Sequence, residues 1–224
     1  MDWFLEYGET RLRVACDKPL RSESLEELIR LYDQLVDYIN KHPLFKASYE
    51  PVDVGKDAPD IARRMAEAAS IAGVGPMAGV AGAFSQFIGE FLVGLGAMDV
   101  VVDNGGDIYL NLSEDKLVRI YAGEIDFSRG LSLMVSAGET PMGVCTSSAS
   151  VGPSISLGES DAVTVVADSA IAADAAATAI GNEVRGRDGI QRGIDRAKSI
   201  RGIRGVIIAA GGGVGYWGRL PEIV

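Results

Sequence analysis

The pattern of apolar and polar positions along the chain predicts an antiparallel sheet combined with helices. Thr10–Cys16 alternates apolar and polar side chains, as a half-buried strand does. From Met98 onward short apolar runs follow one another through turns, which is typical of antiparallel pairing. The strands predicted there are Val100–Val102, Ile108–Leu110, Leu117–Tyr121, Leu131–Ser136, Gly143–Thr146, Val163–Ala167 and Gly205–Ala209.

Helical spacing of apolar residues predicts five helices. The first begins at a capping box, Ser24-Leu25-Glu26-Glu27, and ends near His42, whose place in the last turn suits a cation at a helix C-terminus. The second starts around Asp57–Asp60, with Asp as cap and Pro in the first turn, and stops before Gly73. The others cover Ala78–Leu95, Ser169–Ile180 and Ile190–Ser199.

Small residues fill the first half of the helix Ala78–Leu95, which favours close approach by another backbone or by a ligand. The glycines of Gly211–Gly218 are expected to prevent a regular element there, and Leu220–Val224 is a candidate edge strand. No Pro/Ser-rich linker divides the chain. Residues 1–224 are therefore expected to form a single α+β domain.

Composition and charge narrow the class of protein. The 47% of hydrophobic residues suffices for a full core, and 21 Lys+Arg against 31 Asp+Glu give a net charge of −10, which argues against nucleic acid as a partner. Cys16 and Cys145 form no CxxC pair, so neither a disulfide framework nor a zinc site is expected. His42 is the single histidine, which excludes most histidine-based metal sites and a Ser-His-Asp triad.

The chain carries no pattern of a secretory signal or membrane span. Its first residues lack a basic region followed by an apolar one. The most apolar stretch, Val74–Val102, is interrupted by Pro76, six glycines and polar residues, so it is expected to be a buried helix leading into a strand. A cytoplasmic protein without membrane contact is the expectation.

Three segments carry candidate chemistry, and the first is Asp103-Asn104-Gly105-Gly106-Asp107 between two apolar strands. Asn-Gly is a strong signal for a tight hairpin, which explains the segment structurally. Two aspartates flanking consecutive glycines exceed what a turn needs, however, and bare glycine N–H groups can meet an anionic or carbonyl-bearing ligand. Both interpretations stay open from the sequence.

The second segment is the alanine-rich helix that carries Asp174 and Thr178. These residues are four apart, so both oxygens lie on one face, where a hard cation such as Mg²⁺ could take a carboxylate, a hydroxyl and a nearby carbonyl. The alternative is structural: Asp174 caps a neighbouring loop, and Thr178 bonds back to a main-chain carbonyl.

The third segment, Gly143–Ser154, is rich in hydroxyl groups and glycine. Such a strand end suits hydrogen bonding to a polar ligand, and the same composition is common in ordinary surface loops. Cys145 as a nucleophile would need a general base, and no histidine is free to serve as one, so we interpret it as a core thiol.

In their order along the chain, these segments resemble the ApbE superfamily and in particular its UPF0280 branch. The resemblance covers nearly the whole chain, and the motifs are jointly specific. It implies an α+β ApbE-like fold, an antiparallel sheet packed by helices and related to the tunnelling fold of pterin and purine enzymes. The residues that carry it are Gly75-Pro76-Met77-Ala78-Gly79-Val80-Ala81-Gly82, Asp103–Ile108, Cys145–Ser148, Val163–Ala167 and Ala173–Ala179.

ApbE proteins are Mg²⁺-dependent flavin transferases that split FAD and attach FMN to a threonine of a target protein. The resemblance implies that Asp174 and Thr178 bind the metal together with a main-chain carbonyl near Ala78. It also implies that the remaining candidates border a flavin or pterin. These cofactor-binding candidates are Asn104, Gly105, Gly106, Asp107, Thr146, Ser147 and Ser148.

Three departures from the transferase pattern bear on the reaction. The family's His-x-x-Asp-Pro-x-Thr-Gly signature is absent from Ser148–Asp161, and that loop is short. No lysine stands beside the small residues Gly79–Gly82, where the family has one. UPF0280-like chains often carry a histidine near the position of Pro153. Metal and ligand binding are compatible with these departures, whereas transfer chemistry is not expected.

Three functions follow as hypotheses. The leading one is an ApbE-like protein that binds a flavin, a pterin or a related nucleotide-like ring compound, with Mg²⁺ and an unidentified reaction. The second is FMN transfer to a protein. The third is a non-catalytic binding or assembly protein, with a homo-oligomer as the candidate assembly. The segments Gly75–Gly82, Asn104–Asp107, Thr146–Ser148 and Asp174–Thr178 are expected to converge on one pocket.

Overall fold

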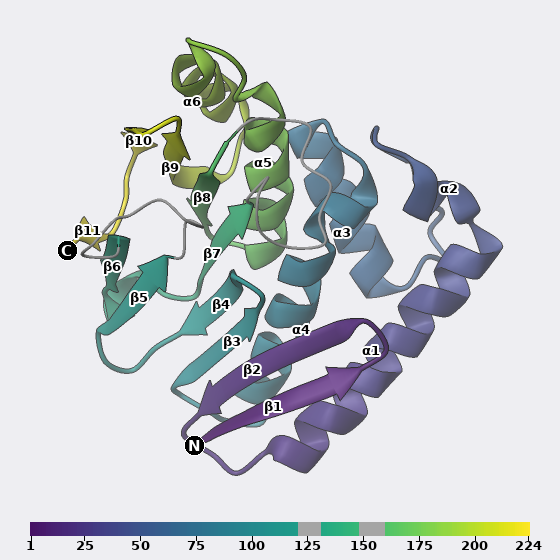
Figure 1. The fold of residues 1–224 in the computed structure, drawn as a ribbon. Coiled ribbons are helices and arrows are strands. Elements are labelled where there is room, and N and C mark those ends of the chain that lie inside the picture. Colours follow the sequence, from purple (N-terminus) through teal and green to yellow (C-terminus); the bar gives the residue numbers. More distant parts are fainter. Residues whose placement is uncertain (121–130, 148–159) are drawn as a thin grey trace.

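The structure is a computed structural model that describes residues 1–120, 131–147 and 160–224. Helices and strands follow one another in a mixed order (Figure 1). The strands are β1 (Asp2–Tyr7), β2 (Thr10–Cys16), β3 (Val100–Asn104), β4 (Asp107–Asn111), β5 (Lys116–Ile120), β6 (Leu131–Val135), β7 (Met142–Ser147), β8 (Ala162–Ala167), β9 (Ile203–Ala210), β10 (Gly213–Gly218) and β11 (Glu222–Ile223). The helices are α1 (Arg21–Lys41), α2 (Pro43–Ala47), α3 (Asp60–Ala72), α4 (Val80–Gly94), α5 (Ala170–Glu183) and α6 (Gly189–Ser199), with short 3₁₀ turns η1 (Pro76–Gly79) and η2 (Ala137–Glu139).

The strands form two sheets in which all described neighbours are antiparallel. Eight strands make the large sheet in the order β1-β2-β3-β4-β7-β8-β9-β10, and the small sheet has the order β11-β6-β5. Neighbours in the large sheet are mostly consecutive along the chain, and tight turns join β1 to β2, β3 to β4 and β9 to β10. The predicted α+β class with an antiparallel sheet packed by helices is confirmed.

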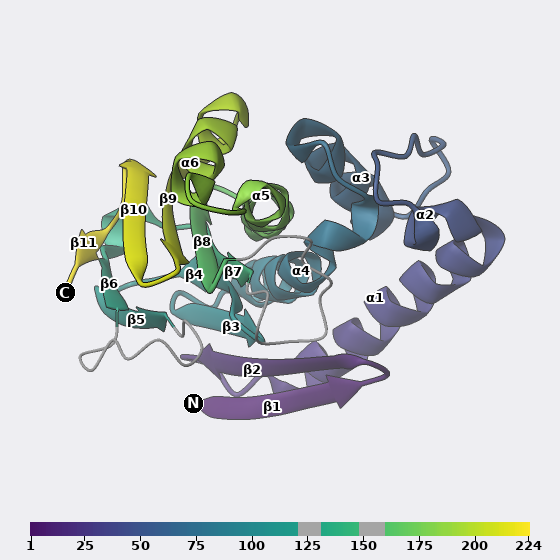
Figure 2. The same ribbon diagram turned by 45° about the horizontal axis from the view of Figure 1, so that its top comes forward.

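Each face of the large sheet has its own hydrophobic core. Helices α1, α3, α4, α5 and α6 pack on one face, and the small sheet lies on the other, as the turned view in Figure 2 shows. The interior strand β8 is buried along its whole length, with Val165 facing the helices and Val166 facing the small sheet. Burial on both faces explains why this strand is a continuous apolar run rather than an alternating one.

Two helix starts differ from the prediction. The first helix begins at Arg21, three residues before the predicted capping box, and its N-cap residue Leu20 makes no side-chain cap. Ser24 is buried within the first turn and donates its hydroxyl to the carbonyl of Arg21 at 2.9 Å, so the capping box is wrong. In α3 the N-cap residue is Pro59 rather than an aspartate. His42 ends α1 as predicted, with its ring 4.4 Å from that of Tyr38.

The prediction for the C-terminal glycine-rich segment is also wrong, because Gly213–Gly218 forms strand β10 at the edge of the large sheet. Its glycines leave room for α6: a methyl group on Gly215 would overlap the side chain of Ile190. Close packing against a helix therefore offsets the low strand propensity of glycine. The predicted edge strand near the C-terminus is present as β11, although it joins the small sheet.

One stretch, Pro76–Gly94, is long and apolar enough by length and composition to cross a membrane. Half of it is buried within the fold, where α4 packs against β3, β4 and α5. The sequence had predicted a buried helix here, and the packing of α4 agrees with that prediction.

Candidate functional site

Four segments that are distant in sequence meet at the start of α4. The amide of Gly82 donates to Asp174 Oδ2 at 2.8 Å, which joins α4 to α5. The side-chain amide of Asn104 donates to the carbonyl of Ala81 at 3.3 Å, which joins the β3–β4 turn to α4. The amide of Thr146 donates to the carbonyl of Gly106 at 3.2 Å, which adds the end of β7. The described parts of these segments are thus in contact, and their convergence on one ligand pocket stays a prediction.

The two aspartates of the β3–β4 turn have different hydrogen-bond partners: Asp103 bonds within the turn, and Asp107 bonds to α4. Gly105 and Gly106 have φ of 66° and 104°, which the tight hairpin requires and which other residues rarely adopt. Asp103 Oδ1 accepts the amide of Gly106 at 2.8 Å, so this carboxylate stabilises the turn itself. Asp107 lies across the turn in β4, and its carbonyl accepts the hydroxyl of Ser85 from α4 at 2.7 Å. Asp107 is thus the aspartate that joins the site.

Asp174 lies at the contact between α4 and α5 with only 9% of its surface exposed. Helix α4 has no side-chain cap of its own at Gly79, and the Asp174 carboxylate supplies one by accepting the amides of Ala81 and Gly82. The structural interpretation of Asp174 as a cap on a neighbouring element is therefore correct. Capping α4 leaves acceptor capacity on the Asp174 carboxylate, because a carboxylate has about four lone-pair sites.

The two site carboxylates have raised pKa values. Burial raises the pKa of Asp174 to about 7, against the lowering effect of the Gly82 and Ala81 amides. Burial and the charge of Asp174 together raise the pKa of Asp107 well above its usual range. None of the main influences on either pKa is a basic side chain of the described residues. Because paired buried carboxylates without a counter-ion are costly to ionise, a cation at this place would stabilise both.

The other two predicted metal ligands lie beside Asp174. Thr178 follows it by one turn of α5 and is partly exposed, and Ala78 lies in η1, which packs against α5. Its neighbour Gly79 faces Ile171 and Ala175 of that helix. A carboxylate, a hydroxyl and a main-chain carbonyl are the hard oxygen donors that Mg²⁺ prefers, so this donor set fits the ion. Among the described residues, no three His, Cys, Asp or Glu side chains gather into a metal site.

The side chains at the end of β7 lie on both faces of the large sheet: Thr146 faces away from the helices, as Val144 does, and Ser147 follows Cys145 on the helix face. The hydroxyls of Thr146 and Thr164 lie 2.9 Å apart on neighbouring strands, and Ser147 ends β7 with its side chain partly exposed. Ser148, with the rest of the short loop that lacks the transferase signature up to residue 159, lies outside the described residues.

Cys145 is a buried free thiol in β7, as predicted, and so is Cys16 in β2. The Sγ atom of Cys145 lies 3.3 Å from the carbonyl oxygen of Ala170 and also contacts the Asp107 carboxylate. Burial and the charges of Asp107 and Asp174 raise the pKa of the thiol well above its usual range. A thiol held neutral in this way is a poor nucleophile, which agrees with a packing role.

The small residues of α4 serve close approach by a backbone. A methyl group on Gly82 would overlap the carbonyl of Ala170 and press on Cβ of Asp174, so this glycine allows α5 to approach α4. Gly143 of β7 does the same against the backbone of Ala170 on its other side. The start of α5 is therefore held between β7 and α4.

Gln86 and Ser169 were not among the predicted site residues, although their hydrogen bonds join the same two helices. Gln86 Oε1 accepts the Ser169 hydroxyl at 2.8 Å and the amide of Ile171 at 3.2 Å. The available signal was a glutamine within an otherwise apolar helix, four residues after Gly82 and so on the same face.

Two surface clefts lie away from this cluster. One, of about 710 Å³, is bordered by Glu139, Asp168, Arg204 and Arg219 at the opposite end of β7. The other, of about 580 Å³, lies between the helix-free face of the large sheet and β5. Asp103 and Ile108 line this second cleft, which places it across the sheet from Asp174.

Comparison with known proteins points to one family. A family model described as "AbpE bacteria" matches residues 2–201. A UPF0280 protein of Methanocella arvoryzae is 43% identical over 216 residues, covering 96% of this chain and 88% of the relative. A UPF0280 protein of Methanocaldococcus jannaschii is 44% identical over 224 residues, covering 96% and 90%.

Solved structures share the fold at low sequence identity. The apo form of the flavinyl transferase ApbE from Pseudomonas stutzeri has a TM-score of 0.65 and 15% identity, and the match covers 97% of this chain and 93% of that one. The flavin transferase ApbE from Vibrio cholerae has a TM-score of 0.62 and 12% identity, with 97% and 96% covered. These likenesses establish an ApbE-like α+β fold.

Proposed function

The chain belongs to the UPF0280 family, matches the "AbpE bacteria" model and has an ApbE-like fold, and from this we propose that it binds a flavin or a pterin-like ring compound together with Mg²⁺. The ligand would lie beside the β3–β4 turn and the end of β7. The metal would be held by Asp174, Thr178 and the carbonyl of Ala78.

One observation carries the proposal: the half-buried Asp107 lies close enough to the buried Asp174 for the charge of Asp174 to raise its pKa, and no basic side chain is among the main influences on either pKa. A protein that only needed to cap α4 could do so with one carboxylate or one hydroxyl. A second carboxylate nearby raises the electrostatic cost, which a divalent cation would remove. Mg²⁺ bound there would supply positive charge to phosphate groups of a nucleotide-like ligand.

The residues of this chain would have separate tasks at the ligand. Gly105 is exposed and carries no side chain over its N–H group, which suits a carbonyl or phosphate oxygen, whereas the Gly106 N–H already donates to Asp103. Ser147 offers a hydroxyl at the adjoining strand end, whereas the Thr146 hydroxyl is paired with that of Thr164 on the other face of the sheet. The raised pKa of Asp107 favours its neutral form in the metal-free protein, and a cation bound nearby would favour the charged form.

The flavin transferases with this fold suggest FMN transfer as the second candidate. We do not favour it, because the chain lacks the His-Asp-Pro signature and offers no evident general base for the acceptor hydroxyl. We further propose that residues 1–224 act as a single domain in the cytoplasm. An assembly role without a ligand would leave the paired carboxylates unexplained.

The test is to identify what the native protein binds. Protein purified under mild conditions would be examined by absorbance and mass spectrometry for a copurifying ring compound. Added FMN and FAD would be titrated with Mg²⁺ and with EDTA, following flavin fluorescence. We expect quenching that requires Mg²⁺ and is lost in Asp174→Ala. Absence of any bound ring compound, and of quenching by either flavin, would contradict a flavin site.

A further inference from the structure

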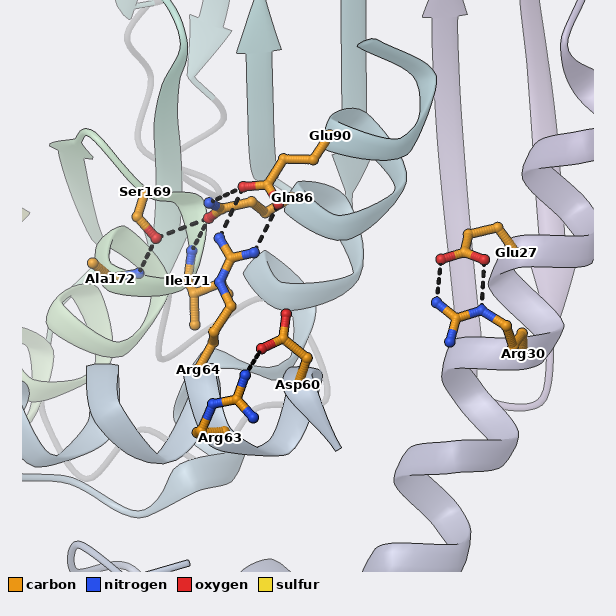
Figure 3. A network of polar contacts seen from close by, with 10 residues as sticks. All are labelled: Glu27, Arg30, Asp60, Arg63, Arg64, Gln86, Glu90, Ser169, Ile171 and Ala172. Carbon is orange, nitrogen blue, oxygen red and sulfur yellow. Dashed lines mark hydrogen bonds and ion pairs between the residues drawn. The ribbon is translucent and has the colours of Figure 1, made fainter. Parts of the chain in front are cut away.

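A buried polar network joins α3, α4 and the start of α5 (Figure 3). At its centre is Gln86, which is 5% exposed and points from α4 toward α5. Its Oε1 accepts the hydroxyl of Ser169, the N-cap residue of α5, at 2.8 Å and the amide of Ile171 at 3.2 Å. Gln86 thereby satisfies one of the amides that the first turn of α5 leaves without a partner.

The orientation of the Gln86 amide is fixed from its other side. Its Nε2 donates to Glu90 Oε1 at 2.7 Å, and Arg64 of α3 holds the same carboxylate through two hydrogen bonds of 2.7 and 2.8 Å. The Arg64 guanidinium also lies over the Phe87 ring, 4.7 Å from its centroid. Because ionised Glu90 only accepts and the Ile171 amide only donates, the glutamine has one satisfactory orientation.

The two helices therefore cap each other. Asp174 of α5 accepts amides at the start of α4, and Gln86 of α4 accepts an amide at the start of α5. Gly82 and Gln86 lie one turn apart on the face of α4 toward α5, while Ile171 and Asp174 lie one turn apart on the facing side of α5. The Gln86–Ile171 hydrogen bond therefore sets the register in which Asp174 meets the Gly82 amide.

We propose that Gln86 is a positioning residue for Asp174, because it fixes the first turn of α5 at the height where the Asp174 carboxylate meets the Ala81 and Gly82 amides. This inference rests on the proposed function only in so far as Asp174 holds Mg²⁺. The geometric part, that Gln86 controls the Asp174–Gly82 contact, can be tested in the metal-free protein.

The experiment compares three single variants of the full chain with the parent. Gln86→Leu removes the acceptor and keeps the side-chain size. Glu90→Gln, at a partly exposed position that tolerates change, removes the charge that orients Gln86. Ile88→Val, on the same helix and fully buried, is the matched control, since it weakens packing without touching the network. Metal-free hydrogen exchange of the Gly82 amide and calorimetric Mg²⁺ titration are measured for each.

We expect the Gly82 amide to exchange faster in Gln86→Leu than in Ile88→Val after matching for global stability. We also expect Mg²⁺ to bind on the order of tenfold more weakly in Gln86→Leu, with a smaller loss in Glu90→Gln and none in Ile88→Val. Equal exchange at Gly82 in all variants would overturn the positioning role. If the parent binds no Mg²⁺, the metal part of the proposed function fails, while Gly82 exchange still decides the role of Gln86. Should Gln86→Leu not fold, Glu90→Gln decides in the same way.

Discussion

Two influences shift the pKa of Asp174 in opposite directions. As a cap on α4 it accepts two amides, which favours the charged form, yet burial beside Asp107 favours the neutral form and raises its pKa to about 7. With this pKa the acid is only partly ionised near neutral pH, so the helix dipole stabilises it less than it would a fully charged cap. A bound cation would resolve this conflict by favouring the charged form.

Stability should therefore fall with rising pH in the metal-free protein. The pKa of Asp174 is raised from 3.8 to about 7 in the folded state, so between these values the folded protein binds more protons than the unfolded chain. The free energy of unfolding should decrease from about pH 4 to about pH 7, by on the order of a few kcal/mol. Urea denaturation in EDTA across this range measures the slope.

Asp174→Asn is the control for this prediction, because its side chain can still accept the Gly82 amide but cannot titrate. The slope should become shallower in the variant, although Asp107, whose pKa is also raised, leaves part of it. Identical slopes in the two proteins would show that Asp174 does not titrate in this range.

Gly82 offers a second test at the scale of single residues. In Gly82→Ala the new methyl group would overlap the carbonyl of Ala170, so α4 and α5 must separate. We expect a loss of about 1–3 kcal/mol in the free energy of unfolding, as is typical of overpacked cores. Gly94→Ala is the matched control on the same helix, since nothing lies within 4 Å of its added Cβ. That control should be neutral or gain up to about 1 kcal/mol, because alanine is the better helix former. Urea denaturation gives both values, and equal effects would refute close packing at Gly82.

At the scale of elements, the start of α5 depends on Ser169. Its hydroxyl accepts the Ala172 amide at 3.3 Å as a helix cap and donates to Gln86. Ser169→Ala should cost about 1–2 kcal/mol of stability, because a cap and a buried hydrogen bond are lost together. Ser199→Ala, at the exposed end of α6, should cost less than about 0.5 kcal/mol. Thermal unfolding of both variants checks the prediction, which a loss in Ser199→Ala as large as that in Ser169→Ala would contradict.

Elements whose evidence is local were predicted from the sequence. Thr10–Cys16 alternates cleanly, and Asn104–Asp107 has turn chemistry of its own, so both were identified correctly. The strand β1 was missed because Phe4 places an apolar side chain on its exposed face and breaks the alternation. The strand β10 was missed because its glycines are explained by contact with Ile190 of α6, which local sequence does not show.

The candidate site was predicted in part. Asp107, Thr146 and Asp174 carry chemistry in recognisable motifs, and the structure brings their segments together. The sequence does not show which of Asp103 and Asp107 accepts the Gly106 amide within the turn, because that depends on the conformation of the folded hairpin. Gln86 was not predicted, because its partners Ser169 and Ile171 lie more than 80 residues away in the sequence.

At the scale of the whole molecule, the fold is shared with flavin transferases while the residues of their transfer signature are not. We therefore expect no attachment of FMN to a threonine-bearing acceptor domain at a useful rate, because no evident general base can deprotonate the acceptor hydroxyl. Incubation with FAD, Mg²⁺ and an acceptor domain, followed by in-gel fluorescence, checks this. A catalytically active ApbE transferase serves as the positive control. Covalent fluorescence on the acceptor with our protein would refute the expectation.

The site as a metal centre is tested most directly by thermal unfolding of the parent and Asp174→Ala in rising Mg²⁺, with and without FMN. Binding to the folded state alone adds about 2.7 kcal/mol at a hundredfold excess over Kd, so the parent should unfold several degrees higher in Mg²⁺. Asp174→Ala should lose this rise, and Thr178→Ala should lose less, because a neutral hydroxyl holds a hard cation more weakly than a carboxylate. An unchanged Tm of the parent in millimolar Mg²⁺, or an equal rise in Asp174→Ala, would contradict a metal site at Asp174.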